Sequence, residues 1–334
     1  MHLLPKESGS LISKTSTNVF INKDGVLKLS EQIANKLLSE EALNFSYSSS
    51  DCHPKPSKDA IDWIFVVDTL NFCFWSDIGK SWEVTWNDKV YTGYFALCAA
   101  INRALQEGIH VTNPKVYSQL SIKDLHHILR GDNEILPLLM EERLNSLHEV
   151  GSILLNKYEG SFVNCVESCN KSAQNLLQLI VTEFPCFRDE ATYKGQRVSF
   201  YKRAQILIGD LWSLFNGKAY GEFHDFETLT MFADYRVPQV LVYFGVLGYK
   251  DELKKKLQSE LLLENGSEEE LEIRGCSIEA VEQVKDVVKE IIKSKNLSPL
   301  CNSVIIDYYL WTYRREHRKE LESIPFHKVK SIYY

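Results

Sequence analysis

The sequence has no apolar run that approaches the length of a membrane-spanning helix, which takes about 20 consecutive apolar residues. Residues 1–14 lack the apolar core of a secretory signal peptide. The eight cysteines stand singly, apart from Cys165 and Cys169, and without a secretory signal we expect reduced thiols. These absences together predict a cytoplasmic protein without a membrane partner.

Common cofactor and metal motifs are also absent. No Gly-x-Gly-x-x-Gly follows an expected strand, and Gly79-Lys80-Ser81 resembles the end of a P-loop whose first glycine is replaced by Phe74. His126 and His127 are adjacent, so on a helix they would point in different directions and not share a metal. We therefore expect neither a metal nor a cofactor.

Positive charge is scarce, with 38 Lys and Arg against 45 Asp and Glu and a formal net charge of −7. Tight binding of a polyanion depends on clustered Lys and Arg, so we expect no direct nucleic-acid binding. A single nucleotide is still compatible with a local cationic pocket. The length of 334 residues suffices for one large or two moderate domains.

Apolar residues recur at helical spacing over much of the chain. The expected helices are residues 27–38, 94–106, 121–130, 138–158, at least one within 161–183, 198–215, 249–263, 278–294 and 304–322. Ser121 and Asp124 form a capping signature at the start of one of them. Residues 266–270 are read as a polar turn.

A small antiparallel sheet is expected in the N-terminal third. Residues 63–75 are rich in β-branched and aromatic side chains, and residues 82–91 alternate around a turn at Asn87-Asp88. Residues 46–58 are rich in Ser, Pro and Lys and are read as a loop. We predict a mainly α protein forming a single unit, 1–334. An alternative is an N-terminal lobe of about 1–110 packed on a helical core of about 111–334.

Three short segments place charged residues among aromatic ones. Asp234 lies in Met-Phe-Ala-Asp-Tyr-Arg (231–236), Asp307 lies in Ile-Ile-Asp-Tyr-Tyr-Leu-Trp (305–311), and Lys202-Arg203 follow Phe-Tyr. A carboxylate beside apolar rings is costly to ionise unless it has a partner or a task. Two such carboxylates and a cationic pair suit a flat base, a sugar cation and a phosphate, which is the chemistry of a nucleotide N-glycosidase.

Each aspartate has two interpretations. Asp307 either sits at a helix start where the dipole favours it, or stabilises or attacks the oxocarbenium-like sugar carbon of a breaking N-glycosidic bond. Asp234 is either a turn carboxylate or salt-bridge partner of Arg236, or it accepts hydrogen bonds from the N–H edge of a guanine-like base. In the second case Phe232 would cover the face of the base.

The cations and the loop histidine are equally open. Lys202 and Arg203 form either a solvated turn or a phosphate clamp, in which Arg offers a fork and Lys a point charge. His53 lies just before Pro54 and, taken alone, is read as a surface residue. Asn71 bonds either its own backbone or a ligand.

Together these segments resemble one family, the queuosine salvage proteins, which are queuosine 5′-phosphate N-glycosidases. The motifs that carry the resemblance are residues 68–75, 198–207, 231–241, 273–277 and 307–311, in the family's order, and the resemblance covers essentially the whole chain. It implies that queuosine 5′-monophosphate is hydrolysed to queuine, a 7-deazaguanine base, and ribose 5-phosphate. It also implies a helical core like that of helix-hairpin-helix DNA glycosylases, with the hairpin at residues 273–277.

The resemblance also implies roles for single residues. Asp307 would be the catalytic carboxylate. The residues expected at the ligand are His53, Phe232, Asp234 and Tyr308, to which we add Met231 beside Phe232, and Lys202 with Arg203 for the 5′-phosphate. The chain departs from the family at Thr312, where other members can carry an acid after the tryptophan. A carboxylate contact from that turn is therefore lost, replaced by the hydroxyl, or supplied elsewhere.

Three other classes of protein fit parts of the pattern. A DNA or RNA glycosylase would need a basic groove, which the net charge of −7 does not favour. A non-catalytic carrier of queuine or a related deazapurine would share Phe232 and Asp234 but would release no ribose phosphate. A helical scaffold would use the aromatic motifs only as core and would not be stabilised by a nucleotide.

Overall fold

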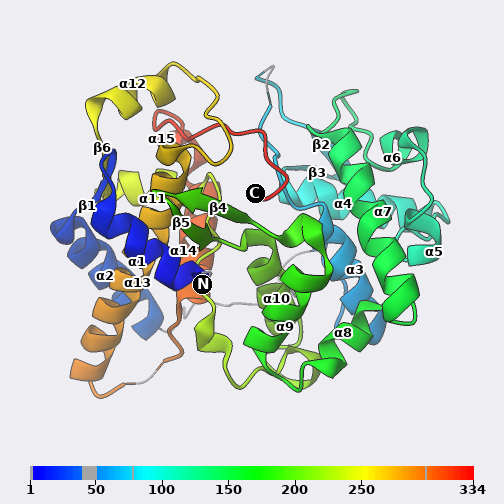
Figure 1. Ribbon diagram of the computed structural model, residues 1–334, viewed down its shortest axis with the longest axis horizontal. Coiled ribbons are helices and arrows are strands. Elements are labelled where there is room, and N and C mark those ends of the chain that lie inside the picture. Colours follow the sequence, from blue (N-terminus) through cyan, green and yellow to red (C-terminus); the bar gives the residue numbers. More distant parts are fainter. Residues whose placement is uncertain (1–2, 40–50, 77–78, 298) are drawn as a thin grey trace. The chain divides into compact units, whose positions relative to one another are not determined.

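The computed structural model describes residues 3–39, 51–76, 79–297 and 299–334 and is mainly helical (Figure 1), which confirms the predicted fold class. The chain divides into two compact units built from discontinuous segments. Unit 1 comprises Met1–Phe45, Asp189–Lys202 and Glu227–Lys330, and unit 2 comprises Ser46–Arg188, Arg203–Phe226 and Ser331–Tyr334. That the chain folds as a single unit, with or without an N-terminal lobe, stays a prediction.

Unit 1 is built around one long helix, α13. Its elements are α1 (Pro5–Thr15), β1 (Val19–Ile21), α2 (Lys23–Leu38), β4 (Glu190–Tyr193), β5 (Gln196–Ser199), α11 (Val237–Tyr243), β6 (Leu247–Tyr249), α12 (Asp251–Gln258), α13 (Glu268–Ser294), α14 (Ser303–Glu316) and α15 (Arg318–Leu321). The short turn η4 (Phe226–Thr228) lies at the boundary of the two units. The expected helices of this unit are all present, with shifted ends.

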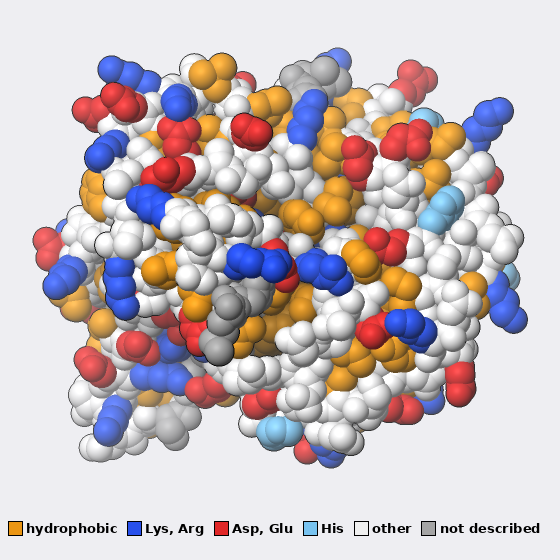
Figure 2. All heavy atoms as spheres, viewed as in Figure 1, with side chains coloured by type: hydrophobic (Ala, Val, Ile, Leu, Met, Phe, Trp, Pro, Cys, Tyr) orange, Lys and Arg blue, Asp and Glu red, His pale blue; other side chains and the backbone are white. Residues whose placement is uncertain are grey.

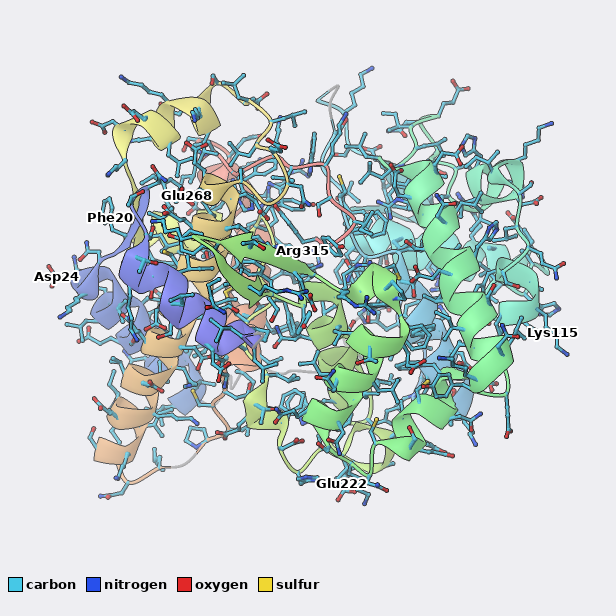
Figure 3. All side chains as sticks on the ribbon, in the orientation of Figure 1. Phe20, Asp24, Lys115, Glu222, Glu268 and Arg315 are labelled. Atoms are coloured by element: carbon cyan, nitrogen blue, oxygen red, sulfur yellow. The ribbon has the colours of Figure 1, made fainter. Side chains whose placement is uncertain are left out.

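Helix α13 begins at Glu268, which is labelled in Figure 3, and runs for 27 residues with α1 and α2 packed against it. The α1–α13 contact is close because both helices present a glycine. A Cβ on Gly275 would lie 2.6 Å from Ile12, and a Cβ on Gly9 would lie 2.7 Å from Ile278. The predicted hairpin at residues 273–277 is wrong, because these residues lie within α13 and the glycine serves packing instead of a turn.

The short strands of unit 1 were not expected from the sequence. β1 pairs antiparallel with β6, with Phe20 opposite Gly248, and β4 pairs with β5. Lys194 and Gly195 join β4 to β5 with positive φ angles of 47° and 81°, as a tight hairpin turn requires. The helix expected from residue 198 therefore begins only at Lys202, after β5.

Unit 2 is a second group of helices with one hairpin. Its elements are α3 (Lys58–Thr69), β2 (Glu83–Trp86), β3 (Lys89–Thr92), α4 (Tyr94–Gln106), α5 (Pro114–Tyr117), α6 (Ile122–Ile128), α7 (Met140–Lys157), α8 (Phe162–Ser168), α9 (Ala173–Glu183), η2 (Pro185–Phe187), α10 (Lys202–Leu214, from its second residue) and η3 (Ala219–Gly221). The β2–β3 hairpin around Asn87-Asp88 and the Ser121 capping box are confirmed.

The strands expected within residues 63–75 are wrong, because residues 58–69 form helix α3. Ser57 caps this helix by accepting a hydrogen bond from the Ala60 N–H at 3.2 Å. From residue 63 to residue 69 every side chain of α3 is buried. A helix that is apolar all round has the composition of a buried strand and no clear period, which explains the error. Of the loop expected at residues 46–58, residues 46–50 lie outside the described residues.

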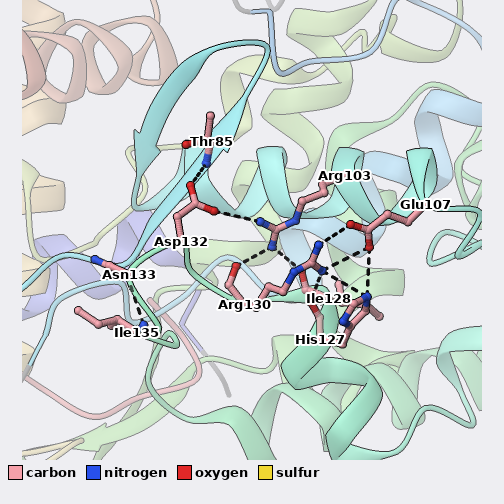
Figure 4. Close-up of polar contacts among 9 residues, drawn as sticks. All are labelled: Thr85, Arg103, Glu107, His127, Ile128, Arg130, Asp132, Asn133 and Ile135. Atoms are coloured by element: carbon pink, nitrogen blue, oxygen red, sulfur yellow. Dashed lines mark hydrogen bonds and ion pairs between the residues drawn. The ribbon is translucent and has the colours of Figure 1, made fainter.

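A cluster of charged side chains connects the β2–β3 hairpin of unit 2 to the helices of the same unit (Figure 4). Asp132 accepts a hydrogen bond from the Thr85 N–H at 2.6 Å and pairs with Arg103 of α4 at 3.4 Å. Arg103 also donates to the carbonyl of Arg130 at 2.6 Å, and Arg130 pairs with Glu107. The cluster is partly exposed, so its stabilisation is modest and rests mainly on the hydrogen bonds to backbone.

The surface agrees with the composition. On the face drawn in Figure 2, Lys and Arg side chains are interspersed with Asp and Glu side chains. Exposed residues of both signs occur in each unit, such as Asp24 in unit 1 and Lys115 and Glu222 in unit 2, all labelled in Figure 3. Among the residues that the structure describes, no helix is both long and apolar enough to span a membrane.

Candidate active site

Asp307 is a buried carboxylate in the second turn of α14. Asn302 caps this helix by accepting a hydrogen bond from the Ile305 N–H at 2.9 Å, and the first turn contains no acidic residue. The helix dipole acts mainly within the first turn, so it does not explain a carboxylate at the fifth position that is only 5% exposed. The interpretation of Asp307 as a helix-start acid is therefore wrong.

The partner of Asp307 comes from the segment 231–236. The backbone N–H of Phe232 donates to Oδ1 of Asp307 at 3.0 Å. The other oxygen, Oδ2, accepts no hydrogen bond from the described residues, and it is not completely enclosed by them. One oxygen of Asp307 is thus fixed by the protein, and the other retains access to a ligand or to water.

Three of the predicted site residues act on one another electrostatically. Burial raises the pKa of Asp307 well above its ordinary value, and the nearby charge of Asp234 raises it further. The Phe232 N–H and the ammonium of Lys202 oppose this rise. Unit 1 therefore brings Asp307, Asp234, Phe232 and Lys202 together, although they come from three separate parts of the sequence.

Asp234 has one oxygen committed to the backbone. Its Oδ1 accepts hydrogen bonds from the N–H groups of Arg236 and Val237, both at 2.9 Å, and so caps the start of α11. Its partner at residue 236 is thus the backbone and not the guanidinium, which donates to Gln239 and stacks on Phe326 at 4.2 Å. Among the described residues, Oδ2 of this half-buried carboxylate accepts no hydrogen bond.

Lys202 is not part of a solvated turn, since it is 6% exposed. Its backbone N–H donates to Asp189 at 3.2 Å. The preceding residue, Tyr201, is buried and holds a φ of 50°, a conformation that costs a bulky residue energy. Strain of this kind clusters at functional sites, and here it lies directly before the first residue of α10.

Arg203 belongs to unit 2 and has a different task from Lys202. It is 1% exposed, and its two terminal nitrogens donate to the backbone carbonyls of Asp68, Thr69 and Cys186. Arg143 holds the next carbonyls of the same turn, and both guanidinium groups stack on Phe72. The hydrogen-bonding capacity of Arg203 is thus largely committed to the backbone, and it lies in the unit that does not contain Asp307.

His53 also lies in unit 2, where it is half-buried. Its ring packs among Trp63, Tyr94 and Phe95, with centroid distances of 5.5 to 6.1 Å. Its Nε2 is 3.2 Å from the Tyr94 hydroxyl, which donates to Asp210 at 3.5 Å. His53 is therefore held in an aromatic environment and is not a simple surface residue. Asn71 of the same unit donates to the carboxylate of Asp68 at 3.0 Å.

The remaining predicted residues lie next to those already described. Met231 is fully buried, and Tyr308 on α14 is half-buried. Trp311 stacks under Arg315, which is labelled in Figure 3, at 5.0 Å. The hydroxyl of Thr312 is enclosed and has no hydrogen-bond partner among the described residues. Replacement of the expected acid by a hydroxyl contact is therefore not seen among the described residues.

The structure adds two groups of α13 that the sequence interpretation missed, the buried Arg274 and the half-buried Glu282. Arg274 donates through Nε to the carbonyl of Ala233 at 3.0 Å and pairs with Asp189. Glu282 accepts hydrogen bonds from Thr230 and Ser303, both at 2.6 Å. The sequence offered one signal for these residues, namely a charged side chain at a position that helical spacing predicts to be buried. The partners named here for Arg274 and Glu282, however, lie 21 to 85 positions away in the sequence.

The arrangement combines a buried carboxylate with charged groups of both signs. A fixed carboxylate stabilises a cationic transition state, and a second carboxylate and a lysine lie within electrostatic reach. Among the described residues, no group of three or more His, Cys, Asp and Glu side chains is arranged to hold a metal ion.

Comparison with known proteins identifies the family. The family described as "Queuosine salvage protein" matches residues 52–334. Proteins named "Queuosine 5'-phosphate N-glycosylase/hydrolase" from Bos taurus and Mus musculus are each 45% identical over 99% of both chains. A protein of that name from Schizosaccharomyces pombe is 36% identical over 98% of this chain and 99% of its own. The chain belongs to the queuosine salvage protein family, which confirms the predicted resemblance.

Proposed function

We propose that this protein hydrolyses the N-glycosidic bond of queuosine 5′-monophosphate and releases queuine and ribose 5-phosphate. Full-length relatives at 45% identity carry the name of this activity. The observation that carries the proposal within the protein itself is the buried Asp307, whose Oδ1 is fixed by the Phe232 N–H while Oδ2 is not used by the described residues. A carboxylate held in this way suits the stabilisation of a sugar cation.

The predicted site residues have different roles in the proposal. Asp307 faces the ribose C1′ and stabilises the cation or forms an ester with it, after which water completes hydrolysis. Asp234 accepts hydrogen bonds from the N–H edge of the base through Oδ2, and Phe232, with Met231 behind it, covers the base. Tyr308 contacts the ligand from α14, and Lys202 meets the 5′-phosphate. His53 is a further ligand contact that the family resemblance implies, whereas Arg203 holds the backbone.

The leaving group explains why recognition of the base matters. A 7-deaza base has no N7, so the protonation that helps an ordinary purine to leave does not operate. The departing base must instead be stabilised by interactions that strengthen in the transition state. A base edge matched by Asp234 meets this need, because a mismatched base would leave a partly buried carboxylate unpaired.

The proposal is tested by incubating the purified protein with queuosine 5′-monophosphate, queuosine and GMP and measuring the released base by chromatography. We expect queuine from the monophosphate, at most slow release from the nucleoside, and no guanine from GMP. Tight binding of queuine without release from any substrate would instead identify a carrier. Release from tRNA or DNA oligonucleotides in preference to the mononucleotide would identify a nucleic-acid glycosylase.

A further inference from the structure

The guanidinium of Arg274 connects two segments of the candidate site that are far apart in the sequence. Its Nε donates to the carbonyl of Ala233, the residue between Phe232 and Asp234, at 3.0 Å. Its Nη1 and Nη2 form a two-pronged ion pair with Asp189, at 3.0 and 2.5 Å. Arg274 is 2% exposed and lies 4.1 Å from the ring of Phe200.

Asp189 carries the connection on to Lys202. The same oxygen that accepts from Nη2, Oδ2, also accepts a hydrogen bond from the Lys202 backbone N–H at 3.2 Å. Asp189 is 3% exposed. An unbroken series of hydrogen bonds therefore runs from the Ala233 carbonyl through Arg274 and Asp189 to the start of α10.

This series links the parts of the proposed site that recognise opposite ends of a nucleotide. In the proposed function, Asp234 meets the base and Lys202 meets the 5′-phosphate. The distance between the two contacts must match the distance between base and phosphate in the substrate, and small errors of position are costly. A planar guanidinium bonded on two sides holds such a distance, which a flexible lysine cannot.

We propose that Arg274, acting through Asp189, is a positioning residue that sets the spacing between the proposed base-binding segment, residues 231–236, and Lys202. It thereby sets the preference for a 5′-phosphorylated substrate over the free nucleoside. The inference rests on the proposed function and deepens it. Neither Arg274 nor Asp189 is assigned a contact with the substrate.

The test measures kcat/KM for queuosine 5′-monophosphate and for queuosine and takes their ratio as the phosphate preference. Arg274→Lys keeps the charge but loses the fork, and we expect the ratio to fall by about tenfold or more, with kcat/KM for the monophosphate down by about 100-fold. Asp189→Asn keeps the hydrogen bond from Arg274 to the Ala233 carbonyl. It should therefore lower the ratio as well, but reduce kcat/KM for the nucleoside less than Arg274→Lys does. This second variant also serves if Arg274→Lys does not fold.

Two comparisons separate positioning from a general loss of structure. Glu272→Gln removes a fully buried carboxylate from the same helix, where it accepts from the Thr17 and Asn18 N–H groups and the Tyr193 hydroxyl. It should lower thermal stability without changing the ratio. In the double variant Lys202→Ala with Arg274→Lys, the ratio should fall no further than in Lys202→Ala alone, because both changes remove the same interaction.

The possible outcomes are distinct. An unchanged ratio in both Arg274→Lys and Asp189→Asn, in an enzyme that releases queuine, would overturn this inference and leave the proposed function intact. An equal fall of the ratio in Glu272→Gln would also overturn it. No queuine release by the unmodified protein from either substrate would overturn the proposed function, and this inference with it.

Discussion

The backbone N–H of Phe232 donates a hydrogen bond to Oδ1 of Asp307 although 75 positions separate the two residues. The same segment carries Asp234, whose charge raises the pKa of Asp307. The residue proposed to cover the base and the residue proposed to meet the sugar are thus in direct contact. Positional errors in one are expected to reach the other.

Replacing Asp307 with Asn should abolish turnover and increase stability at neutral pH. Burial raises the pKa of Asp307, so the folded state binds the proton more tightly than the unfolded state. Stability is then lost as pH rises from the ordinary aspartate value through the raised one. Asn removes that loss, with a gain of about 1 kcal/mol in unfolding free energy. Thermal unfolding at pH 7 and pH 4 checks the sign, since the gain should disappear at the lower pH.

Turnover by Asp307→Asn near the normal rate would contradict its catalytic role. Binding of the nucleotide should persist in this variant, because the neutral side chain keeps the shape of the site. A ligand-induced rise in Tm measures that binding. Loss of both turnover and binding would point to a role in recognition instead.

The acidic limb of the pH profile of kcat/KM should shift when the charges near Asp307 are changed. Catalysis requires the ionised carboxylate, so kcat/KM should fall with decreasing pH at a value above the ordinary aspartate range. Asp234→Asn removes a like charge and lowers the pKa of Asp307, so the limb should move to lower pH. Lys202→Met removes an opposite charge and should move it to higher pH. Limbs at the same pH in all three proteins would show that another group titrates.

Lys202→Ala should weaken the phosphorylated substrate more than the nucleoside. A hydrogen bond to a charged group contributes about 1.5–3 kcal/mol, which corresponds to a loss of roughly 10- to 150-fold in kcat/KM for queuosine 5′-monophosphate. The nucleoside lacks the phosphate and should lose much less. Equal losses for both substrates would show that Lys202 does not contact the phosphate.

Arg203→Lys provides the contrast to Lys202. The lysine cannot reach the carbonyls of Asp68, Thr69 and Cys186 together, so buried acceptors are left unpaired. We expect a loss of about 2–4 kcal/mol in unfolding free energy, measured by denaturant titration, with little change in phosphate preference. A selective loss on the phosphorylated substrate would restore Arg203 as a phosphate contact.

Glu282→Gln should weaken the connection that Glu282 makes between Thr230, which directly precedes the base-binding segment, and Ser303 of α14. Hydrogen bonds from Lys285, Ser303 and Thr230 lower the pKa of Glu282 against the opposing effect of its burial. Its contribution to stability is present above the unfolded value of about 4.3 and is lost as pH falls through the folded one. The variant should lose about 2 kcal/mol of unfolding free energy at pH 7, and the loss should shrink as the pH falls below the ordinary glutamate range, with a reduced kcat at neutral pH.

The matched control for Glu282 is Glu279→Gln on the same helix. Glu279 accepts a hydrogen bond from Gln283, one turn further along the helix, at 2.9 Å, and touches neither Thr230 nor Ser303. It should leave kcat unchanged. A similar loss of kcat in both variants would argue against a specific role for Glu282.

The sequence by itself determined most helices and the residues of the candidate catalytic segments. Helical spacing located α2, α4, α7 and α14 because each buries one face, and a buried face leaves a period in the sequence. Asp307 and Asp234 were recognisable as carboxylates among aromatic residues. The strand expected in place of α3 shows the limit, since a helix buried on all sides has no such period.

The tertiary structure decided which groups act together. Lys202 and Arg203 are neighbours in the sequence, yet one lies near Asp307 and the other holds backbone carbonyls in unit 2. Arg274 gave no sign in the sequence of its partners Asp189 and Ala233, which lie 85 and 41 positions away. Local patterns report whether a side chain is buried, whereas the partner that stabilises a buried charge is set by the packing of distant segments.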